Sequence, residues 1–347
     1  MYRKKSLDKE AKIYIAGHTG TAGSAIVKLL HKRGYYNLVL KESSELDLKN
    51  QQSVEDFFKK EKPEYVFMCA ATPCGVANMQ YRADFIYNNI MMQINVIHAS
   101  FKYKVKKMIC FGSGYMYPKE AQNPLKEEYI LSGKLDYSVE PYALSKIMAL
   151  KASEAYNIQY NTEFICVAIN NLYGGNANFD LKQARLIPAL LKKFYLAKLL
   201  QEQNYTKLFN ELNITESENI EEVLKEIGIF KNQVFLWGDG KTRREFIHCE
   251  DLADACIYLM EYDFATYNLH FNVGTGVDYS IADVASIVSN VVGFNGDIKF
   301  DVTKPSSDMN RLMDCSKIHS LGWKHKIELE QGIKMMYEWY LKKQRSE

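Results

Sequence analysis

Tyr142 and Lys146 stand four residues apart and form the pair in this sequence best suited to proton transfer. Apolar residues recur at helical spacing in the stretch 142–150, and side chains four apart on a helix lie on the same face. A phenol titrates near 10, but a neighbouring ammonium favours the phenolate and lowers that pKa. A shift of about three units needs roughly 4 kcal/mol of differential stabilisation. Tyr142 is therefore a candidate to exchange a proton with a carbonyl or alcohol oxygen.

The same Tyr-x-x-x-Lys spacing is common on helices that carry no chemistry, so the surrounding segments decide its meaning. A buried strand is predicted at Lys107–Phe111, after a long helical stretch, and Ser113 follows the end of that strand. The helix of Tyr142 is the next crossover in the chain, so Ser113 is expected at the carboxyl end of a strand.

A glycine-rich turn lies near the start of the chain, after a predicted strand at Lys12–Ala16 and before a helix with one apolar face. Strand, glycine turn and helix in this order are the context of a dinucleotide-binding loop, because glycine lets the backbone approach a diphosphate at the helix N-terminus. The spacing is G-x-x-G-x-x-G, and a loop that binds no nucleotide remains an alternative. The candidate cofactor contacts in this turn are Gly17, Thr19, Gly20, Thr21 and Gly23.

The second predicted strand, Asn37–Leu40, is followed by Lys41 and then Glu42. An acid at this strand end binds a free ribose 2′-hydroxyl, whereas a base accommodates a 2′-phosphate. The signal is mixed, and the first position favours NADPH through Lys41. Further candidate cofactor contacts are Asp47 and Leu48 near the adenine, and the small residues Ala70 and Ala71 after the third predicted strand.

Strands and helices alternate through the first half of the chain, which predicts a parallel sheet with helices on both faces. Ligands of such a sheet bind at the carboxyl ends of its strands. We therefore predict an α/β fold with a Rossmann-type doubly wound sheet and a smaller C-terminal α/β substrate domain. The groups expected to gather at the sheet edge are Gly17, Ala70, Ser113 and the loop 170–174.

Two domains are expected from this pattern. Residues 1–175 form the NADP-binding domain, with residues of about 230–275 contributing, and 176–347 are mainly the substrate domain. The segment of about 200–229 is charged with apolar residues at helical spacing, and predicts an inserted helical pair. That insertion is expected to shape a lid or an interface, and a simple spacer is the alternative.

The composition is that of an ordinary soluble protein, with 347 residues, 47% apolar, 25% charged and a net charge of +2. This balance gives no case for nucleic acid or a membrane as a partner, and no run approaches the ~20 apolar residues that span a bilayer. The seven cysteines are scattered without a C-x-x-C pair, so neither a disulfide framework nor a metal site is expected. They are typical of a reduced, cytoplasmic protein.

Several short motifs in register along most of the chain resemble those of the extended short-chain dehydrogenase/reductase family, and within it the GDP-L-fucose synthases. They are Gly17–Gly20, Ala83–Tyr87, Glu140–Ala143, Asn171–Gly174, Ile187–Leu190, Arg244–Phe246 and Leu321–Trp323. The resemblance implies NADPH, a GDP-linked 4-keto-6-deoxy sugar, and a homodimer built through the long helices. It assigns Ser113, Tyr142 and Lys146 to a catalytic triad, in which Lys146 also holds the nicotinamide ribose.

The loop after the sixth predicted strand and the C-terminal half supply the remaining candidate contacts. Asn170 and Leu172 join Tyr142 and Lys146 as cofactor-binding residues. Arg244 and Lys304 are the cations expected to face the substrate diphosphate, because a guanidinium fork matches phosphate oxygens. The full set of candidate substrate contacts is Tyr115, Asn171, Arg185, Lys193, Trp237, Arg244 and Lys304.

The sequence departs from the family at the two residues that epimerise C3 and C5. Those enzymes use a Cys two residues after the triad serine, where this chain has Tyr115, and a His where it has Arg185. A guanidinium stays protonated and cannot shuttle a proton. The hypothesis is a C4 reductase without epimerase activity that works beside a separate epimerase, on a hexose or heptose. The alternatives are a bifunctional epimerase/reductase that uses Tyr115, and a non-catalytic NADP-binding regulator.

Overall fold

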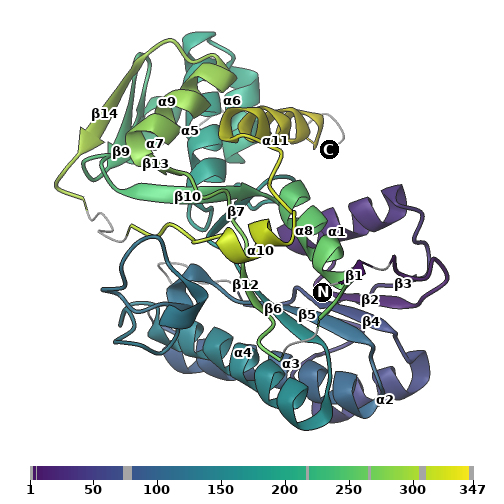
Figure 1. Ribbon diagram of the computed structural model, residues 1–347. Coiled ribbons are helices and arrows are strands. Elements are labelled where there is room, and N and C mark those ends of the chain that lie inside the picture. The colour runs from purple at the N-terminus through teal and green to yellow at the C-terminus, as the bar shows by residue number, and fades with distance from the viewer. Residues whose placement is uncertain are drawn as a thin grey trace. The chain divides into compact units, whose positions relative to one another are not determined.

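The structure is a computed structural model and describes residues 3–4, 6–72, 80–215, 219–264, 267–304 and 310–343 (Figure 1). The chain divides into two units. The first comprises Met1–Leu172, Glu245–Val277 and Arg311–Lys326, and the second comprises Tyr173–Arg244, Asp278–Asn310 and Ile327–Glu347. The segment Arg311–Lys326 thus lies in the first unit. The assignment of an NADP-binding domain to 1–175 and mainly a substrate domain to 176–347 stays a prediction.

A six-stranded parallel sheet in the order β12-β6-β5-β4-β2-β3 forms the centre of the first unit. Its strands are β2 (Ile13–Ala16), β3 (Leu38–Val39), β4 (Tyr65–Met68), β5 (Lys107–Phe111), β6 (Phe164–Ala168) and β12 (His270–Asn272). Continuous apolar runs such as these are typical of parallel strands buried on both faces. The predicted Rossmann-type sheet is confirmed.

Helices cover both faces of this sheet, and alternate residues of each strand enter different cores. Ile13 and Ile15 of β2 pack with α1 (Thr21–Lys32) and α8 (Cys249–Met260) on one face. Tyr14 and Ala16 pack on the other face with α2 (Gln51–Glu61), α3 (Arg82–Lys102) and α4 (Glu140–Tyr160). The remaining elements of this unit are short: β1 (Arg3–Lys4), η2 (Gly114–Met116), η3 (Glu127–Tyr129), β11 (Tyr262–Asp263) and α10 (Ser316–Ser320).

The second unit has a three-stranded sheet in the order β14-β9-β8 and a group of helices. Its elements are α5 (Leu186–Gln201), α6 (Tyr205–Leu212), α7 (Ile220–Glu226), β8 (Ile229–Phe230), β9 (Gln233–Trp237), β13 (Asp278–Ser280), α9 (Ile281–Val292), β14 (Asp297–Asp301) and α11 (Leu329–Lys343). Strands β7 (Asn171–Tyr173) and β10 (Arg243–His248) each contain a point where the chain passes between the units.

The predicted insertion contains α6 and α7, and both helices bury apolar side chains. Leu208 and Leu224 are fully buried. The Lys192 ammonium of α5 forms an ion pair with Glu211 of α6, and it donates a hydrogen bond to the Tyr340 hydroxyl at 2.9 Å. The insertion is thus packed into the second unit. Among the described residues, no helix is both long enough and apolar enough to cross a membrane.

Candidate active site

The turn after β5 carries the candidate serine. Ser113 is 8% exposed, and its Oγ accepts the backbone N–H of Tyr115 at 3.3 Å at the start of η2. A Cβ on the next residue, Gly114, would overlap the Asn170 amide oxygen, so only glycine fits there. The turn is therefore tightly packed where the serine hydroxyl is presented.

Helix α4 presents Tyr142 and Lys146 one turn apart on the same face. The helix begins at Glu140 with Pro141 in its first turn, a position where a missing N–H costs nothing. Lys146 is 3% exposed, and its Nζ lies 5.6 Å from the centroid of the Tyr142 ring. A buried ammonium thus lies beside a half-buried phenol, as the spacing in the sequence predicts.

The side chains of Tyr115 and Arg311 lie next to Tyr142. Tyr115 was predicted as a site residue from the sequence, and Arg311 was not. The Tyr115 ring meets the Tyr142 ring edge to face, with centroids 6.4 Å apart and planes at 80°. The guanidinium carbon of Arg311 lies 5.8 Å from the Tyr115 ring centroid. Arg311 donates to the backbone carbonyls of Gly114 and Tyr117, which are 197 and 194 positions away in the sequence. No local motif predicts such contacts.

The glycine turn between β2 and α1 leaves room for a diphosphate. Gly17 has φ +76°, and a Cβ there would lie 2.7 Å from the backbone nitrogen of Ala70. A Cβ on Gly23 would lie 2.7 Å from the Cα of His18. The N-cap of α1 is Gly20, which has no side chain to cap the helix, and a helix N-terminus favours a bound anion. This cradle fits the diphosphate of a dinucleotide.

The predicted adenosine contacts lie around the end of β3. The Lys41 ammonium forms an ion pair with Glu45 at 2.6 Å, and this hydrogen bond raises the pKa of Lys41. Such an exposed ion pair is weak, so a 2′-phosphate is able to compete for the lysine. Asp47 accepts the backbone N–H of Lys49 at 3.0 Å, and Leu48 is buried. Ala70 and Ala71 follow β4 and are half-buried.

The loop after β6 is held by a buried carboxylate that was not predicted as a site residue. Glu245 is fully buried and accepts the Asn170 amide at 2.7 Å and the backbone N–H groups of Thr275 and Gly276 at 2.9 and 2.8 Å. Burial raises the pKa of Glu245. The Asn171 amide donates to the Glu245 carbonyl at 2.8 Å. Both asparagines thus fix this loop, and Leu172 packs against the core of the first unit.

The other candidate substrate contacts lie in the second unit, and their roles stay predictions. Arg185 is the N-cap of α5, and the Lys193 ammonium donates to the carbonyl of Phe235 at 3.3 Å while burial lowers its pKa. The side chain of Trp237 is 65% exposed, and that of Lys304 is exposed as well.

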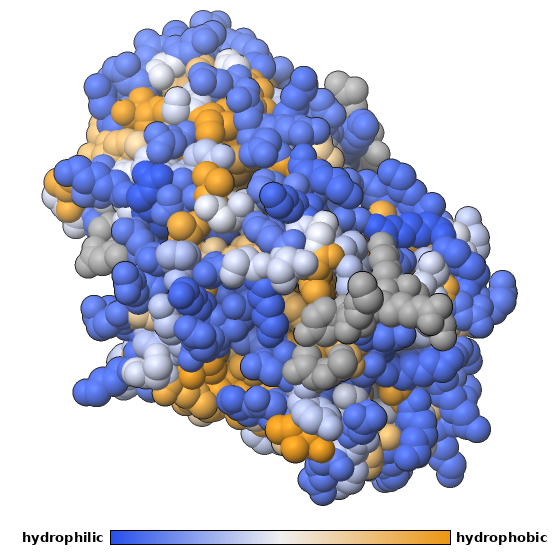
Figure 2. Space-filling view, viewed as in Figure 1, coloured by the Kyte–Doolittle hydropathy of each residue, from blue (hydrophilic) through white to orange (hydrophobic). Residues whose placement is uncertain are grey.

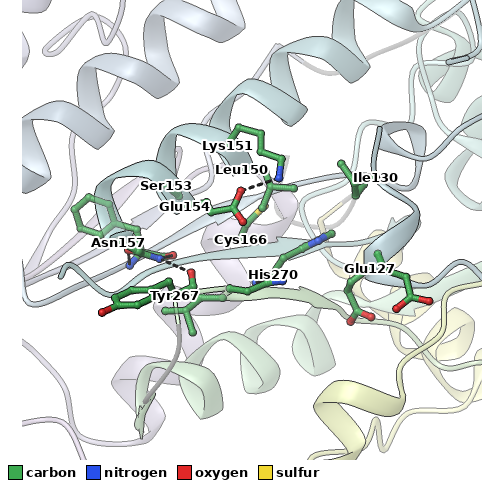
Figure 3. A pocket seen from close by; sticks show the side chains of 14 residues that line it. Glu127, Ile130, Leu150, Lys151, Ser153, Glu154, Asn157, Cys166, Tyr267 and His270 are labelled. Atoms are coloured by element: carbon green, nitrogen blue, oxygen red, sulfur yellow. Dashed lines mark hydrogen bonds and ion pairs between the residues drawn. The ribbon is translucent and has the colours of Figure 1, made fainter. Parts of the chain in front are cut away.

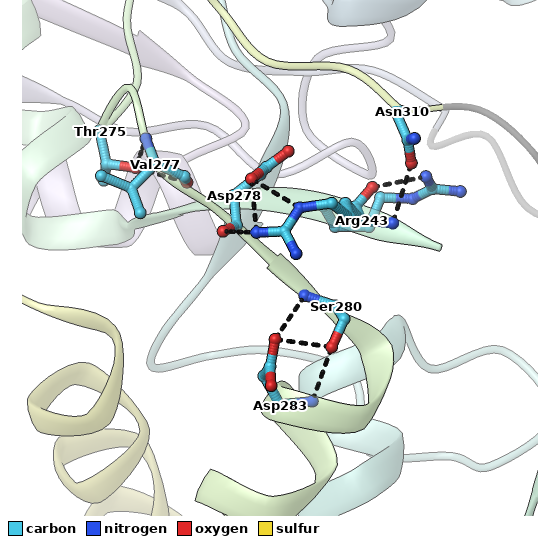
Figure 4. A network of polar contacts seen from close by, with 8 residues as sticks. Arg243, Thr275, Val277, Asp278, Ser280, Asp283 and Asn310 are labelled. Atoms are coloured by element: carbon cyan, nitrogen blue, oxygen red, sulfur yellow. Dashed lines mark hydrogen bonds and ion pairs between the residues drawn. The ribbon is translucent and has the colours of Figure 1, made fainter. Parts of the chain in front are cut away.

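Arg244 lies next to Arg243 at the start of β10. Arg243 donates to the carboxylate of Asp278 at 2.9 Å and to its carbonyl at 2.8 Å (Figure 4). Arg244 donates to the carbonyl of Arg243 at 2.9 Å. The side chain of Arg243 is therefore held by an ion pair with Asp278. The predicted phosphate contact is its neighbour, Arg244.

A cavity of about 130 Å³ lies between the C-terminal half of α4, η3 and the strands β6 and β12 (Figure 3). Its wall includes His270, Glu127 and the ion pair of Lys151 with Glu154. Within the described part of the chain, the residues that line it include none of the predicted site residues. It is therefore separate from the group around Tyr142.

Comparisons with known proteins give the following similarities. The model of the NAD dependent epimerase/dehydratase family matches residues 13–274. Putative GDP-L-fucose synthase 2 of Arabidopsis thaliana is 42% identical over 336 residues, covering 96% of this chain and 93% of that protein. GDP-L-fucose synthase of Escherichia coli (strain K12) is 38% identical over 341 residues, covering 96% and 97%.

Two solved structures from Campylobacter jejuni are more similar in sequence. A GDP-6-OMe-4-keto-L-xylo-heptose reductase is 56% identical with a TM-score of 0.92, covering 97% of this chain and 99% of that chain. A GDP-mannoheptose C4 reductase with NADP bound is 56% identical with a TM-score of 0.90, covering 97% and 100%.

Proposed function

The chain belongs to the NAD dependent epimerase/dehydratase family, and from that premise we propose that it reduces the C4 ketone of a GDP-linked 4-keto-6-deoxy sugar without epimerising C3 or C5. The predicted resemblance to the GDP-L-fucose synthases is confirmed by relatives 42% and 38% identical over nearly the whole chain. The protein is an oxidoreductase of GDP-sugar biosynthesis, and its cofactor is NADPH.

The observation that carries the proposal is the arrangement of Ser113, Tyr142 and Lys146. A serine at the carboxyl end of β5 and a phenol beside a buried ammonium are groups that bind and protonate a carbonyl oxygen. The glycine turn and the N-terminus of α1 would hold the cofactor diphosphate. Lys41 would hold its 2′-phosphate.

In this mechanism, the hydroxyl of Ser113 donates a hydrogen bond to the C4 oxygen and orients the ketone. NADPH, when bound, supplies the hydride. As the C4 oxygen gains negative charge, the hydroxyl of Tyr142 donates its proton to that oxygen and leaves a phenolate. The Lys146 ammonium, 5.6 Å from the phenol ring, stabilises the phenolate until solvent reprotonates it. The product is a C4 alcohol.

The absence of epimerisation is proposed from the two substituted positions. A reversible acid–base pair next to the ketone needs side chains that both gain and lose a proton during turnover. Arg185 stays protonated, and Tyr115 packs edge to face on Tyr142. A separate epimerase would then act elsewhere in the same reaction sequence.

A heptose is favoured as the sugar. The reductases that resemble this chain at 56% identity are named for GDP-linked heptoses, whereas the fucose synthase from Arabidopsis thaliana is 42% identical. The candidate contacts Trp237, Arg244 and Lys304 are proposed to bind the GDP, and Tyr115, Asn171, Arg185 and Lys193 are each proposed as further substrate contacts.

A bifunctional epimerase/reductase is the second candidate, because the curated relatives are named as synthases and Tyr115 lies near the Arg311 guanidinium. A non-catalytic NADP-binding regulator is not favoured, since the proteins that this chain resembles are named as synthases and reductases.

Product analysis in deuterated water separates the two candidates. The protein is incubated with NADPH and either GDP-4-keto-6-deoxy-mannose or the corresponding GDP-4-keto-6-deoxy-heptose, and the products are identified by NMR. The proposal expects a C4 alcohol with protium at C3 and C5 and a higher kcat/KM for the heptose. Deuterium at C3 or C5 would establish the bifunctional enzyme instead.

We also infer a homodimer through α3 and α4. The outward stripe of α4 runs through Leu144, Met148, Lys151, Ala155 and Ile158, at spacings of three and four. Leu144 is 40% exposed and Ile158 is 60% exposed, and Tyr87 of the adjacent α3 is 61% exposed. Figure 2 shows apolar surface along the lower edge of the first unit, where Figure 1 draws these two helices. A second copy of the same face would cover it.

A further inference from the structure

One arginine holds both ends of the turn that presents Ser113. The Nη1 of Arg311 donates to the carbonyl of Gly114 at 2.9 Å and to the carbonyl of Tyr117 at 3.2 Å. These two carbonyls belong to the first residue of η2 and to its C-cap residue. Arg311 is 7% exposed, so these hydrogen bonds are sheltered from water.

The same guanidinium faces the Tyr115 ring, and that ring meets Tyr142. A cation within about 6 Å of a ring centroid is attracted to the ring face, and the Arg311 distance of 5.8 Å satisfies this. Ring centroids 6.4 Å apart with planes at 80° lie in the favourable range for an edge-to-face pair. A continuous series of contacts therefore runs from Arg311 through Tyr115 to the candidate proton donor.

The backbone of Arg311 is itself anchored. Its carbonyl accepts the Asn170 amide at 3.0 Å, and the same amide donates to the buried carboxylate of Glu245 at 2.7 Å. An arginine fixed at its backbone and at its guanidinium keeps little rotamer freedom. A lysine in its place would offer a single point of donation and no planar fork.

We propose that Arg311 is a positioning residue for the C4 reduction, which holds the Ser113 hydroxyl and, through Tyr115, the Tyr142 phenol in one geometry toward the ketone oxygen. This rests on the proposed function, in which both hydroxyls act on that oxygen. A small misplacement of such groups lowers the rate of the chemical step more than it weakens binding. The signature of the role is thus a loss of kcat with little change in KM.

The test compares R311K, Y115L, the double variant and Y115F. We expect R311K and Y115L each to lower kcat by about tenfold, with KM for NADPH changed by less than about twofold. R311K should also leave KM for the sugar within about twofold of native. Because both changes act on one series of contacts, the double variant should also lose about tenfold and not about a hundredfold. Y115F keeps the ring and should therefore lose less of its kcat than Y115L.

The matched control is R33K, which alters another arginine of the same unit. Arg33 pairs with Asp254 and with Glu261, and has no part in the site. The proposal expects R33K to keep the native kcat even where its thermal stability falls. It is overturned if R33K loses kcat as R311K does, if the two losses multiply, or if Y115F loses activity as fully as Y115L.

A second measurement does not depend on turnover. In crystal structures of Y115L and R311K with NADPH, the Tyr142 hydroxyl should be displaced or occupy two rotamers, whereas R33K should match the native protein. An unmoved Tyr142 in both variants would overturn the positioning role. Failure of the native protein to reduce any GDP-4-keto sugar would overturn the proposed function while this structural comparison still decides the role of Arg311.

Discussion

The hydroxyl of Tyr142 is the group on which proton delivery depends, so Y142F should abolish most turnover. Proton transfer from a positioned side chain contributes about 10²- to 10⁴-fold to a rate, and kcat should fall by that factor. The affinity for NADPH, measured by fluorescence titration, should stay within about twofold of native, because the ring is retained. The control is Y160F, which removes an exposed hydroxyl from the other end of α4. Intact turnover in Y142F would rule out Tyr142 as the acid.

His270, in the wall of the cavity, should make the fold sensitive to acid. It is 3% exposed, its Nε2 has no hydrogen-bond partner among the described residues, and burial lowers its pKa from 6.5 to about 3. The folded state therefore binds fewer protons than the unfolded state between these values, so stability falls as pH falls below about 6.5. From pH 6.5 to pH 5 the loss should be about 2 kcal/mol, at about 1.4 per unit.

Denaturant unfolding at several pH values checks this. H270Q cannot titrate, so its stability should decline by about 2 kcal/mol less than the native protein over that interval. H31Q is the control for the loss of an exposed histidine, because His31 lies on the surface of α1. Parallel curves for the native protein and H270Q would mean that His270 contributes no acid sensitivity.

The turn between β2 and α1 allows steric and functional effects of glycine to be separated. A Cβ on Gly23 would overlap the backbone of the turn, so G23A should cost about 1–3 kcal/mol of stability and weaken NADPH binding. A Cβ on Gly20 would meet only Gly17 at 3.5 Å, an ordinary contact. G20A should therefore fold normally yet lose about tenfold in NADPH affinity, because the methyl group meets the diphosphate.

The control for this pair is G34A. Gly34 has φ +81° and open space around its Cα, so alanine there meets backbone strain of about 1–2 kcal/mol and no ligand. Calorimetry and NADPH titration of the three variants should give three different combinations of effects. Native NADPH affinity in G20A would place the diphosphate elsewhere.

Elements that are contiguous in sequence were predictable, and contacts that join distant segments were not. The strand, glycine turn and helix at 13–32 lie in one stretch, and each step has a local signal in residue type or spacing. Arg311 has no such signal, since its partners are backbone groups brought together by the fold. Glu245 lies in the motif Arg244–Phe246, but the motif did not indicate its buried contacts, which are largely with backbone groups as well. Asn170 was predicted as a cofactor contact, and the structure adds that its amide holds Glu245.

The division of the whole chain shows the same limit. The first unit contains the segment Arg311–Lys326, which returns to it after the chain has passed through the second unit. No motif in the sequence marks this return, and the prediction from the sequence was only that 176–347 is mainly the substrate domain. Its return is what brings Arg311 to the turn at Ser113.

Assembly through α3 and α4 can be tested by placing charge on the exposed stripe. In an isologous dimer each substitution occurs twice at the interface, and burying an unpaired carboxylate is strongly unfavourable. L144E/I158E should therefore elute as a monomer in size-exclusion chromatography with light scattering, with an unchanged circular dichroism spectrum. Y36E is the control, because Tyr36 is 74% exposed but lies outside both helices, before β3. A stable interface needs about 1,600 Å² of buried surface, so an L144E/I158E variant that remains a dimer would place that surface on another face.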